Sequence, residues 1–492
     1  MQNSIQPAPR HWWLPSIPVI VFAVIFLASL VFMPQMLNGD GDLGRHLTVG
    51  ALILETGTIP MRDLFSHTLP DAPVIPHEWL AQVLFAFAYR VANLNGVAWL
   101  AALALAATYA VLTWGLERAG VRALFAGLLA GFASMMSSLH QLTRPHIFSW
   151  LFFILFLIIL EEDRRAGRRA ILFLLLPLTI VWANLHSMFV TGLMLVLFYA
   201  LGALLERKRH AFELGALALG MFALAGMHPS GWAVPFHLFE YTQSRFLLDL
   251  TVEHQSPNFH HPNVWLFAGW LILSLVVGGR THRALAWTQV VVLGAWTGLA
   301  LYAARNIPLY ALASALVVGP ALDQWIAQIP RLDNFLARTD LIARQSWGWM
   351  WAALFCALLI ALNALGFAFG IGGKANAFDP RVFPVAAVDH LARARLTGNL
   401  FNEFTWGGYL LYRSWPPQRV FIDGFTDFYG EALTREYWQT IQGESNWEAI
   451  LDRYAVEWVI VRADARLIAR LRESSRWVES YRDETAAIWR RR

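Results

Sequence analysis

The apolar residues of this chain fall in blocks that are long enough to cross a lipid bilayer. A hydrocarbon core about 30 Å thick needs roughly 20 residues of helix. Such blocks occur at 15–34 and at about 78–94, 97–116, 122–138, 146–160, 170–185, 188–205, 211–227, 263–279, 285–303, 307–321 and 348–370. The sequence therefore predicts an all-α polytopic membrane bundle with about 11–13 transmembrane helices.

The composition agrees with this class and excludes several others. Hydrophobic residues make up 57% of the chain and charged residues only 15%, which is too little charge to cover a water-soluble globule of 492 residues. The single cysteine, Cys356, excludes a disulfide framework, an iron–sulfur cluster and a cysteine-based zinc site. The net charge of +4 collects in short loops between apolar blocks, so we expect no nucleic-acid partner.

Basic loops predict the orientation of the helices. The runs 164–169, 207–209 and 280–283 carry the strongest positive charge, and the positive-inside rule places them in the cytoplasm. The first block follows Arg10 without a cleavage site, so we expect a retained helix and a cytoplasmic N-terminus.

One pair of early blocks conflicts with this orientation. If 78–94 and 97–116 both crossed the membrane, the run 161–169 would lie outside, against its charge. We therefore expect one early block to be short, re-entrant or interfacial. The block 78–94 is favoured because it contains Arg90, and a span missed elsewhere is the alternative.

The composition changes after the last apolar block. Residues 1–373 form the predicted transmembrane domain, with 35–76 as its first outer loop, and residues 374–492 contain no spanning block. Strand-like runs at 418–422 and 457–461 alternate with helical stretches at 431–441 and 463–475, which indicates a small α/β domain. The predicted orientation makes this domain extracytoplasmic.

Unusual polar residues occur at one set of helix ends, those predicted to face outward. They are Asp40, Asp42, Arg45, His46, His77, Glu78, Arg144, His146, Asn184, His186, His228, Glu253, His254 and Arg305. A single histidine or arginine at such a place is more often a snorkelling anchor or a helix cap. Ionisable groups at membrane depth are costly, however, so their convergence at one face predicts a water-accessible cavity.

Asp40 and Asp42 have two interpretations. The glycines around them favour an Asx turn, in which the carboxylates only stabilise the loop. Two carboxylates that are two residues apart, with His46 one helical turn beyond Asp42, also suit a general base or a divalent metal ion held by Asp40, Asp42 and His46. These residues alone leave both interpretations open.

Several motifs together resemble a known family. A first helix followed by a long loop with an Asp-x-Asp motif, many further helices and an outer domain resembles the GT-C type integral-membrane glycosyltransferases. More narrowly, the chain resembles an uncharacterised group of bacterial polytopic glycosyltransferase-like membrane proteins over nearly its whole length. The motifs are 41–46 (GDLGRH), 57–60 (GTIP), 63–66 (DLFS), 77–80 (HEWL), 144–145 (RP), 184–186 (NLH), 406–409 (WGGY) and 421–424 (FIDG).

The resemblance implies transfer of a sugar from a polyprenyl-phosphate donor to a lipid, glycan or protein acceptor at the outer face of the bacterial cytoplasmic membrane, in cell-envelope assembly. Asp42 or Asp40 would be the general base, or a metal ligand if a divalent ion is used. The donor phosphate would be bound by Arg144, Arg305, His77 and His186. The remaining residues expected in the cavity are His46, Glu78, Asn184, His228 and Glu253.

Two other functions stay open at this point. A non-catalytic scaffold for envelope assembly would have Asp40 and Asp42 facing solvent or capping helices. A transporter would place polar groups near mid-membrane in broken helices, and here they lie at one end. The aromatic and acidic segments 406–409 and 423–429 suit a carbohydrate platform, but a glycine turn packed by core aromatics is the more common arrangement.

Overall fold

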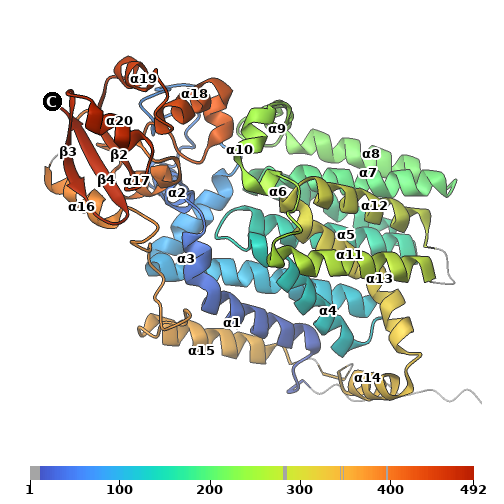
Figure 1. Cartoon of the computed structure of the whole chain (residues 1–492). Helices are drawn as coiled ribbons and strands as arrows, with labels where there is room; N and C mark the ends of the chain where they lie inside the picture. The colour runs from blue at the N-terminus through green and yellow to red at the C-terminus, as the bar shows by residue number, and fades with distance from the viewer. Residues whose placement is uncertain (1–11, 281–284, 344, 347, 395–396) are drawn as a thin grey trace, which may run out of the picture.

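The computed structural model describes residues 12–280, 285–343, 345–346, 348–394 and 397–492, and most of them are helical. Figure 1 shows a large helical bundle with a small sheet domain at one end. The helices of the bundle are α1 (Ile17–Asn38), α2 (Leu43–Thr56), α3 (Trp79–Arg118), α4 (Ala123–Met136), α5 (His146–Ala166), α6 (Leu175–Leu185), α7 (Phe189–Leu205), α8 (His210–Ala225), α9 (Ala233–Gln243), α10 (Arg245–Leu250), α11 (Trp265–Arg280), α12 (Trp287–Tyr302), α13 (Ile307–Ile326), α14 (Pro330–Ala343) and α15 (Met350–Ala364).

Apolar helices of membrane-spanning character confirm the predicted integral membrane class. By length and composition, four helical stretches of the described residues can each cross a bilayer: Ile17–Asn38, Trp79–Arg118, Pro262–Gly279 and Ala304–Ile326. Other apolar helices, such as Phe189–Leu205 and His210–Ala225, are shorter. The number of spans, set at 11–13 from the sequence, therefore stays a prediction.

Helix α3 contains both early apolar blocks, and its backbone breaks between them. Ala92 has φ −150° and ψ 32°, and Asn93 has φ 52° and ψ −142°, so neither residue is helical. The part before the break, from Trp79 to Val91, is shorter than the roughly 20 residues of a span. Arg90 in this part pairs with Glu55 of α2 at 3.2 Å, at an exposed position. These features agree with a short early segment, as the charge of 161–169 requires.

The C-terminal part forms a small mixed sheet with helices around it. Its strands are β1 (Asn399–Asn402), β2 (Val456–Arg462), β3 (Trp477–Arg482) and β4 (Ala486–Arg491), in the order β1-β2-β4-β3. Strands β1 and β2 are parallel, and the other neighbours are antiparallel. The helices are α16 (Val385–Ala394), α17 (Gly407–Ser414), α18 (Thr426–Ile441), α19 (Trp447–Arg453) and α20 (Leu467–Glu473).

The predicted small α/β domain is thus present, with one change in detail. Strand β2 contains the predicted run 457–461, and α18 and α20 contain or lie within the predicted helical stretches. The run 418–422 is not a strand of the sheet. Instead, Val420 donates its amide to the carbonyl of Phe65 and accepts from His67, both at 3.0 Å, in an isolated pairing with the first outer loop.

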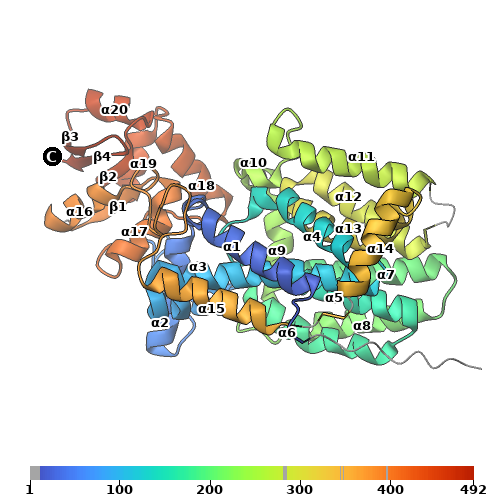
Figure 2. The same ribbon diagram turned by 90° about the horizontal axis from the view of Figure 1, so that it is seen from below.

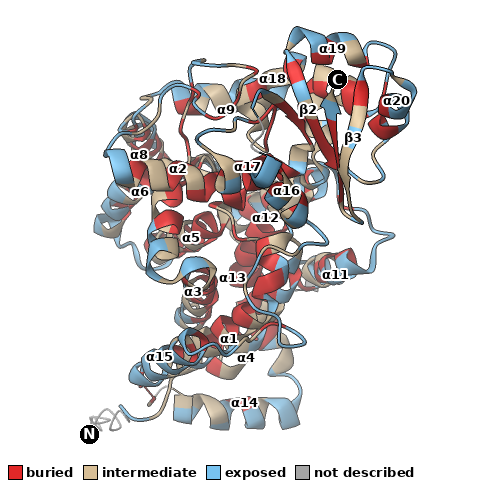
Figure 3. Ribbon diagram, turned by 90° about the vertical axis from the view of Figure 1, so that its left-hand side faces the viewer, coloured by how far each residue is buried: buried red, intermediate tan, exposed pale blue. Residues whose placement is uncertain are grey.

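The sheet domain and the polar amphipathic helix α14 lie at opposite ends of the bundle (Figures 1 and 3). The connection between α7 and α8, which contains the basic run 207–209, also lies away from the sheet domain (Figure 1). Viewed from below, α2 and the start of α3 lie beside the sheet domain (Figure 2). Of the sequence features used for orientation, Arg10 and residues 281–283 lie outside the described residues.

Burial follows this arrangement. Buried residues gather between the helices and on the sheet, while α14 and α15 are largely exposed (Figure 3). One continuous apolar core joins α1, α3, α5 and α13, and includes Phe26, Tyr109, Trp150 and Trp296. Exposed leucine, phenylalanine and tryptophan side chains on the outer faces of the helices suit contact with lipid.

Candidate active site at the helix ends

Arg144 joins the two carboxylates of the Asp-x-Asp motif. It precedes α5, and Asp40 and Asp42 lie between α1 and α2. Its Nε lies 2.8 Å from Oδ2 of Asp40, and its Nη2 donates a hydrogen bond to Oδ2 of Asp42. The contact with Asp42 is a hydrogen bond and the contact with Asp40 is an ion pair, so one planar guanidinium holds both carboxylates near the start of α5.

Asp42 stands at the N-cap position of α2 but does not cap the helix with its side chain. Its backbone carbonyl accepts from the amide of His46 at 3.0 Å, while its carboxylate turns to Arg144. An N-cap aspartate normally accepts amide hydrogen bonds of the first turn through its side chain. The capping interpretation of Asp42 therefore does not describe this geometry.

The Asp40 carboxyl has a pKa near neutrality. Burial raises its pKa from 3.8 to about 7, and the nearby charges of Asp42 and Glu253 act in the same direction, while Arg144 opposes them. A carboxyl with a pKa near the working pH is well suited to accept a proton. Of the two motif carboxylates, Asp40 is the one that this environment favours as a base.

Glu253 links the motif to a second arginine. It lies in η3 (Val252–His254), with one carboxylate oxygen 3.9 Å from Arg144 and the other 3.9 Å from Arg305. Burial alone would raise the pKa of Glu253, but Arg305 and Arg144 lower it to about 2, so this carboxylate is ionised. Arg305 also donates to Nε2 of His254 at 2.7 Å. The structure thus brings Arg144 and Arg305 to the two sides of one carboxylate.

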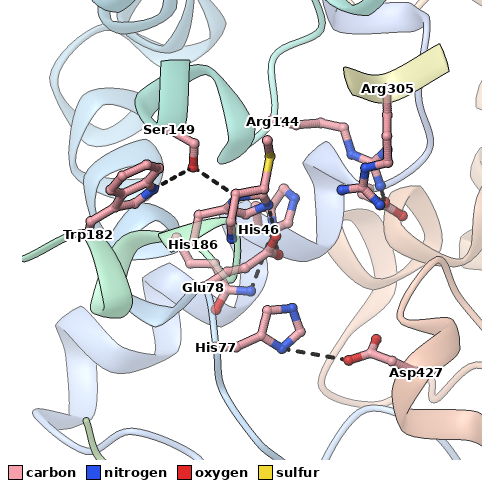
Figure 4. Close-up of polar contacts among 12 residues, drawn as sticks. His46, His77, Glu78, Arg144, Ser149, Trp182, His186, Arg305 and Asp427 are labelled. Atoms are coloured by element: carbon pink, nitrogen blue, oxygen red, sulfur yellow. Dashed lines mark hydrogen bonds and ion pairs between the residues drawn. The ribbon is translucent and has the colours of Figure 1, made fainter. Parts of the chain in front are cut away.

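Glu78 lies at the centre of a second group of polar side chains, next to the Asp-x-Asp motif (Figure 4). His186 Nε2 lies 3.3 Å from one of its oxygens and His46 Nδ1 3.8 Å from the other. Burial would raise the pKa of Glu78, but the hydrogen bond from His186 and the neighbouring His46 and His77 hold it well below its usual value. Glu78 is therefore an ionised carboxylate between two imidazoles.

The tautomer of His186 follows from its other contacts. The Met188 amide donates to its Nδ1 at 3.3 Å, and Ser149 Oγ lies 3.0 Å from the same nitrogen. Trp182 Nε1 in turn donates to Ser149 Oγ at 2.8 Å. With Nδ1 acting as an acceptor, Nε2 carries the proton that faces Glu78. The tautomer of His46 does not follow in this way, because its buried Nε2 has no hydrogen-bond partner among the described residues.

His77 faces the sheet domain instead of Arg144 or Arg305. Its Nδ1 lies 3.6 Å from Asp427 Oδ2, and His237 Nε2 lies 2.8 Å from the same oxygen. His237 belongs to α9 and Asp427 to α18. This group joins the first outer loop, the bundle and the sheet domain, beside the group of polar side chains around Glu78 (Figure 4).

Two predicted cavity residues have mainly structural contacts. The Oδ1 of Asn184 accepts from Trp79 Nε1 at 2.8 Å, and its amide donates to the carbonyls of Ile180 and Met227. Nδ1 of His228 accepts from the amide of Ser230 at 3.0 Å. Burial and the nearby His77 lower the pKa of His228 to about 4, so it is neutral.

The described residues do not favour the predicted metal site. They contain no group of three or more histidine, cysteine, aspartate or glutamate side chains arranged to hold a metal ion. Asp40 and Asp42 instead pair with Arg144, and the Nδ1 of His46 faces Glu78 and Gln82. A guanidinium balances the two carboxylates here, and a divalent ion held by Asp40, Asp42 and His46 stays a prediction.

Sequence reasoning missed the contribution of the sheet domain. Asp423 forms a buried ion pair with Arg45 at 2.6 Å, and Asp427 binds two histidines. The sequence suggested a carbohydrate platform or a packed glycine turn for the segments 406–409 and 423–429, and did not predict their contacts with the first outer loop. Trp406 and Tyr409 are each 1% exposed, so they are core residues and not an open carbohydrate platform.

Sequence comparison does not identify the chain. No protein-family model matches it, and no curated protein matches its sequence. The fold, in contrast, resembles solved structures over most of its length.

The archaeal oligosaccharyltransferase AglB from Archaeoglobus fulgidus, in complex with an inhibitory peptide and a dolichol-phosphate, is 11% identical, with a TM-score of 0.58 over 90% of this chain and 69% of that chain. ArnT from Cupriavidus metallidurans, bound to undecaprenyl phosphate, is 13% identical, with a TM-score of 0.52 over 96% and 97%. The Archaeoglobus enzyme is also known in complex with Zn and sulfate, at 13% identity and a TM-score of 0.52 over 90% of this chain and 68% of that chain.

Identities this low establish a fold and not an activity. Both neighbours are GT-C superfamily membrane glycosyltransferases, and ArnT aligns over nearly the full length of both chains. The chain therefore has the fold of the GT-C membrane glycosyltransferases, which is the superfamily that its sequence motifs resemble.

Proposed function

We propose that this protein is a membrane glycosyltransferase that moves a sugar from a polyprenyl-phosphate donor to an acceptor. The observation that carries the proposal is the set formed by Asp40, Asp42 and Arg144, because it combines a carboxyl with a pKa of about 7 and a half-buried cation. Solved neighbours of the same fold are known in complex with dolichol-phosphate or undecaprenyl phosphate, which supports a lipid-linked donor.

The chemistry assigns a role to each group. Asp40 accepts the proton of the acceptor hydroxyl or amine, while the acceptor atom attacks the anomeric carbon of the sugar. The bond from that carbon to the phosphate oxygen breaks, and polyprenyl phosphate leaves. Arg144 and Arg305 face the negative charge that develops on this phosphate, and Asp42 orients Arg144.

The geometry favours transfer over a scaffold. A scaffold that had lost its chemistry would have no reason to bury paired carboxylates, yet Asp42 is 8% exposed and does not cap α2 with its side chain. Buried charges are costly unless they are paired, so their retention at one site suits a catalytic use.

A transfer assay tests the proposal directly. The protein would be purified into nanodiscs and given a panel of polyprenyl-phosphate sugars with detergent-extracted envelope lipids and glycans as acceptors. We expect release of polyprenyl phosphate from at least one donor, and loss of that release in the Asp40→Asn/Asp42→Asn double variant. Equal release by the wild type and the double variant, or no release from any donor by a folded wild type, would contradict the proposal.

We further propose that the site and the sheet domain lie outside the cytoplasm. The basic connection between α7 and α8 lies at the end of the bundle away from the sheet domain, which supports this orientation (Figure 1). In a Cys356→Ala background, the exposed Ser445→Cys is expected to react with an impermeant thiol reagent in intact cells.

Ala166→Cys, exposed at the end of α5, is the matched control for the opposite face. It is expected to react only after lysis. The reverse labelling pattern at these two positions would show that the sheet domain is cytoplasmic.

Asp42→Asn is expected to shift the pH dependence of transfer as well as to slow it. Asp42 raises the pKa of Asp40, so loss of its charge lowers that pKa, and the rise of rate with pH moves from about 7 to lower pH. Loss of the charge that orients Arg144 should slow the rate by about 10²-fold. The measurement is kcat against pH for both proteins, with thermal unfolding in parallel. An unshifted pH profile would show that the charge of Asp42 does not influence the pKa of the general base.

A further inference from the structure

The loop that carries Asp40 and Asp42 is in direct backbone contact with the sheet domain. A Cβ atom on Gly41 would lie 2.1 Å from the carbonyl oxygen of Thr405. One on Gly44 would lie 2.3 Å from the carbonyl oxygen of Gly408, and one on Gly408 would lie 2.3 Å from that of Gly41. Neither segment has room for a side chain here, so glycine in both segments allows the two backbones to come together.

A buried ion pair fixes the same contact. Arg45, one turn after Asp42, donates to Asp423 at 2.6 Å, and the two side chains are 7% and 0% exposed. Asp423 also accepts from the amide of Phe425 at 2.9 Å, and the Arg45 guanidinium lies 4.4 Å from the centre of the Phe425 ring. Removing one partner of such a pair leaves an unpaired buried charge, so the pair specifies how α2 meets the sheet domain.

Gly424 touches the Asp42 carboxylate itself. A Cβ atom at this glycine would lie 1.6 Å from Oδ1 of Asp42, closer than any non-bonded contact allows. The other oxygen, Oδ2, accepts from Arg144. Asp42 is thus held between the bundle, through Arg144, and the sheet domain, through Gly424.

We propose that the sheet domain completes the active site, with Gly424 and Asp423 as positioning residues for the Asp-x-Asp loop. This inference rests on the proposed function for its catalytic meaning, but the contact itself does not depend on it. Gly424 leaves the space that the Asp42 carboxylate occupies, while Asp423 holds α2 through Arg45. The proposed transferase therefore needs its sheet domain for chemistry.

The contact can be tested without any activity. Gly424→Ala is expected to lower the midpoint of thermal unfolding by about 2–4 °C, because overpacking forces Asp42 or the backbone to move. In an Asp42→Ala background the space is free, so adding Gly424→Ala should cause no further loss. An equal loss in both backgrounds would overturn the proposed contact.

The catalytic consequence is tested by kinetics on the full-length protein in nanodiscs. Gly424→Ala is expected to lower kcat about 10²-fold with little change in KM for the donor. The substitution displaces the Asp42 carboxylate, which is not itself proposed to contact the donor. The double variant Gly424→Ala/Asp42→Asn should be no slower than Asp42→Asn alone, because both changes act through one group.

Gly269→Ala is the control, since this glycine of α11 has open space around it and should keep full activity. Full activity of Gly424→Ala, or effects that multiply in the double variant, would overturn the positioning role. If the wild type transfers no sugar while the thermal cycle behaves as expected, the contact stands and the proposed function fails.

Discussion

Asp40→Asn is expected to abolish most sugar transfer, lowering kcat about 10²–10⁴-fold, because a positioned general base is commonly worth that much. The wild-type rate should rise with pH and level off above about 7, where the Asp40 carboxyl is deprotonated. The small residual rate of the variant should lack this rise. Initial rates from pH 5 to 9 with a saturating lipid-linked donor measure both effects.

Stability separates this loss from misfolding. A carboxyl whose pKa is raised on folding stabilises the protein below its unfolded pKa of 3.8, and this contribution is lost as pH rises through about 7. Asp40→Asn should therefore unfold at a higher temperature than the wild type at pH 8. Asp71→Asn, in the same outer loop at a side chain 74% exposed, should leave rate and pH profile unchanged. If the Asp40→Asn variant kept the wild-type rate and pH profile, Asp40 would have no role in the mechanism.

Arg144→Lys is expected to lower kcat by about 10²–10³-fold, in the range seen when one donor to a developing oxyanion is removed. The guanidinium contacts Asp40 through Nε and Asp42 through Nη2, and an ammonium group cannot make two such contacts with fixed geometry. The remaining face of the fork is the part proposed to meet the donor phosphate. Binding of undecaprenyl phosphate should weaken in parallel, measured by calorimetry in nanodiscs.

Arg62→Lys is the matched control for this substitution. Arg62 lies in the same outer loop, its side chain is 64% exposed, and it pairs only with the exposed Asp71 among the carboxylates of the described residues. Its replacement should change neither transfer nor binding of the lipid phosphate. Equal behaviour of Arg144→Lys and Arg62→Lys would show that Arg144 serves the fold alone.

The active-site hypothesis was only partly accessible from the sequence. Helix ends that face the same way can be matched by counting spans, so Asp40, Asp42, Arg144, Glu253 and Arg305 were expected at one face. The sequence did not show which of these side chains contact one another. Arg144 lies about a hundred residues after Asp42, and the Asp-x-Asp spacing gave no sign that it pairs with both carboxylates.

The fold shows the same division. Long apolar blocks predicted a helical membrane bundle, because backbone N–H and C=O groups in lipid need hydrogen-bond partners and a helix supplies them within each segment. The run 418–422 looked like a strand of the C-terminal sheet, yet Val420 pairs with Phe65 and His67 of the first outer loop. A local pattern of β-branched and aromatic residues favours extended backbone but does not name its partner.

The sequence by itself therefore determined the helical membrane class of the protein and the presence of a small C-terminal sheet domain, but it did not predict helix α2, which lies inside the expected first outer loop. The class and the domain follow from local hydrophobicity and charge, which act over one helix at a time. The tertiary structure alone decided that Arg45 pairs with Asp423 and that Gly424 lies against Asp42. Such contacts join segments nearly four hundred residues apart, and they arise from close packing of two backbones that no local pattern records.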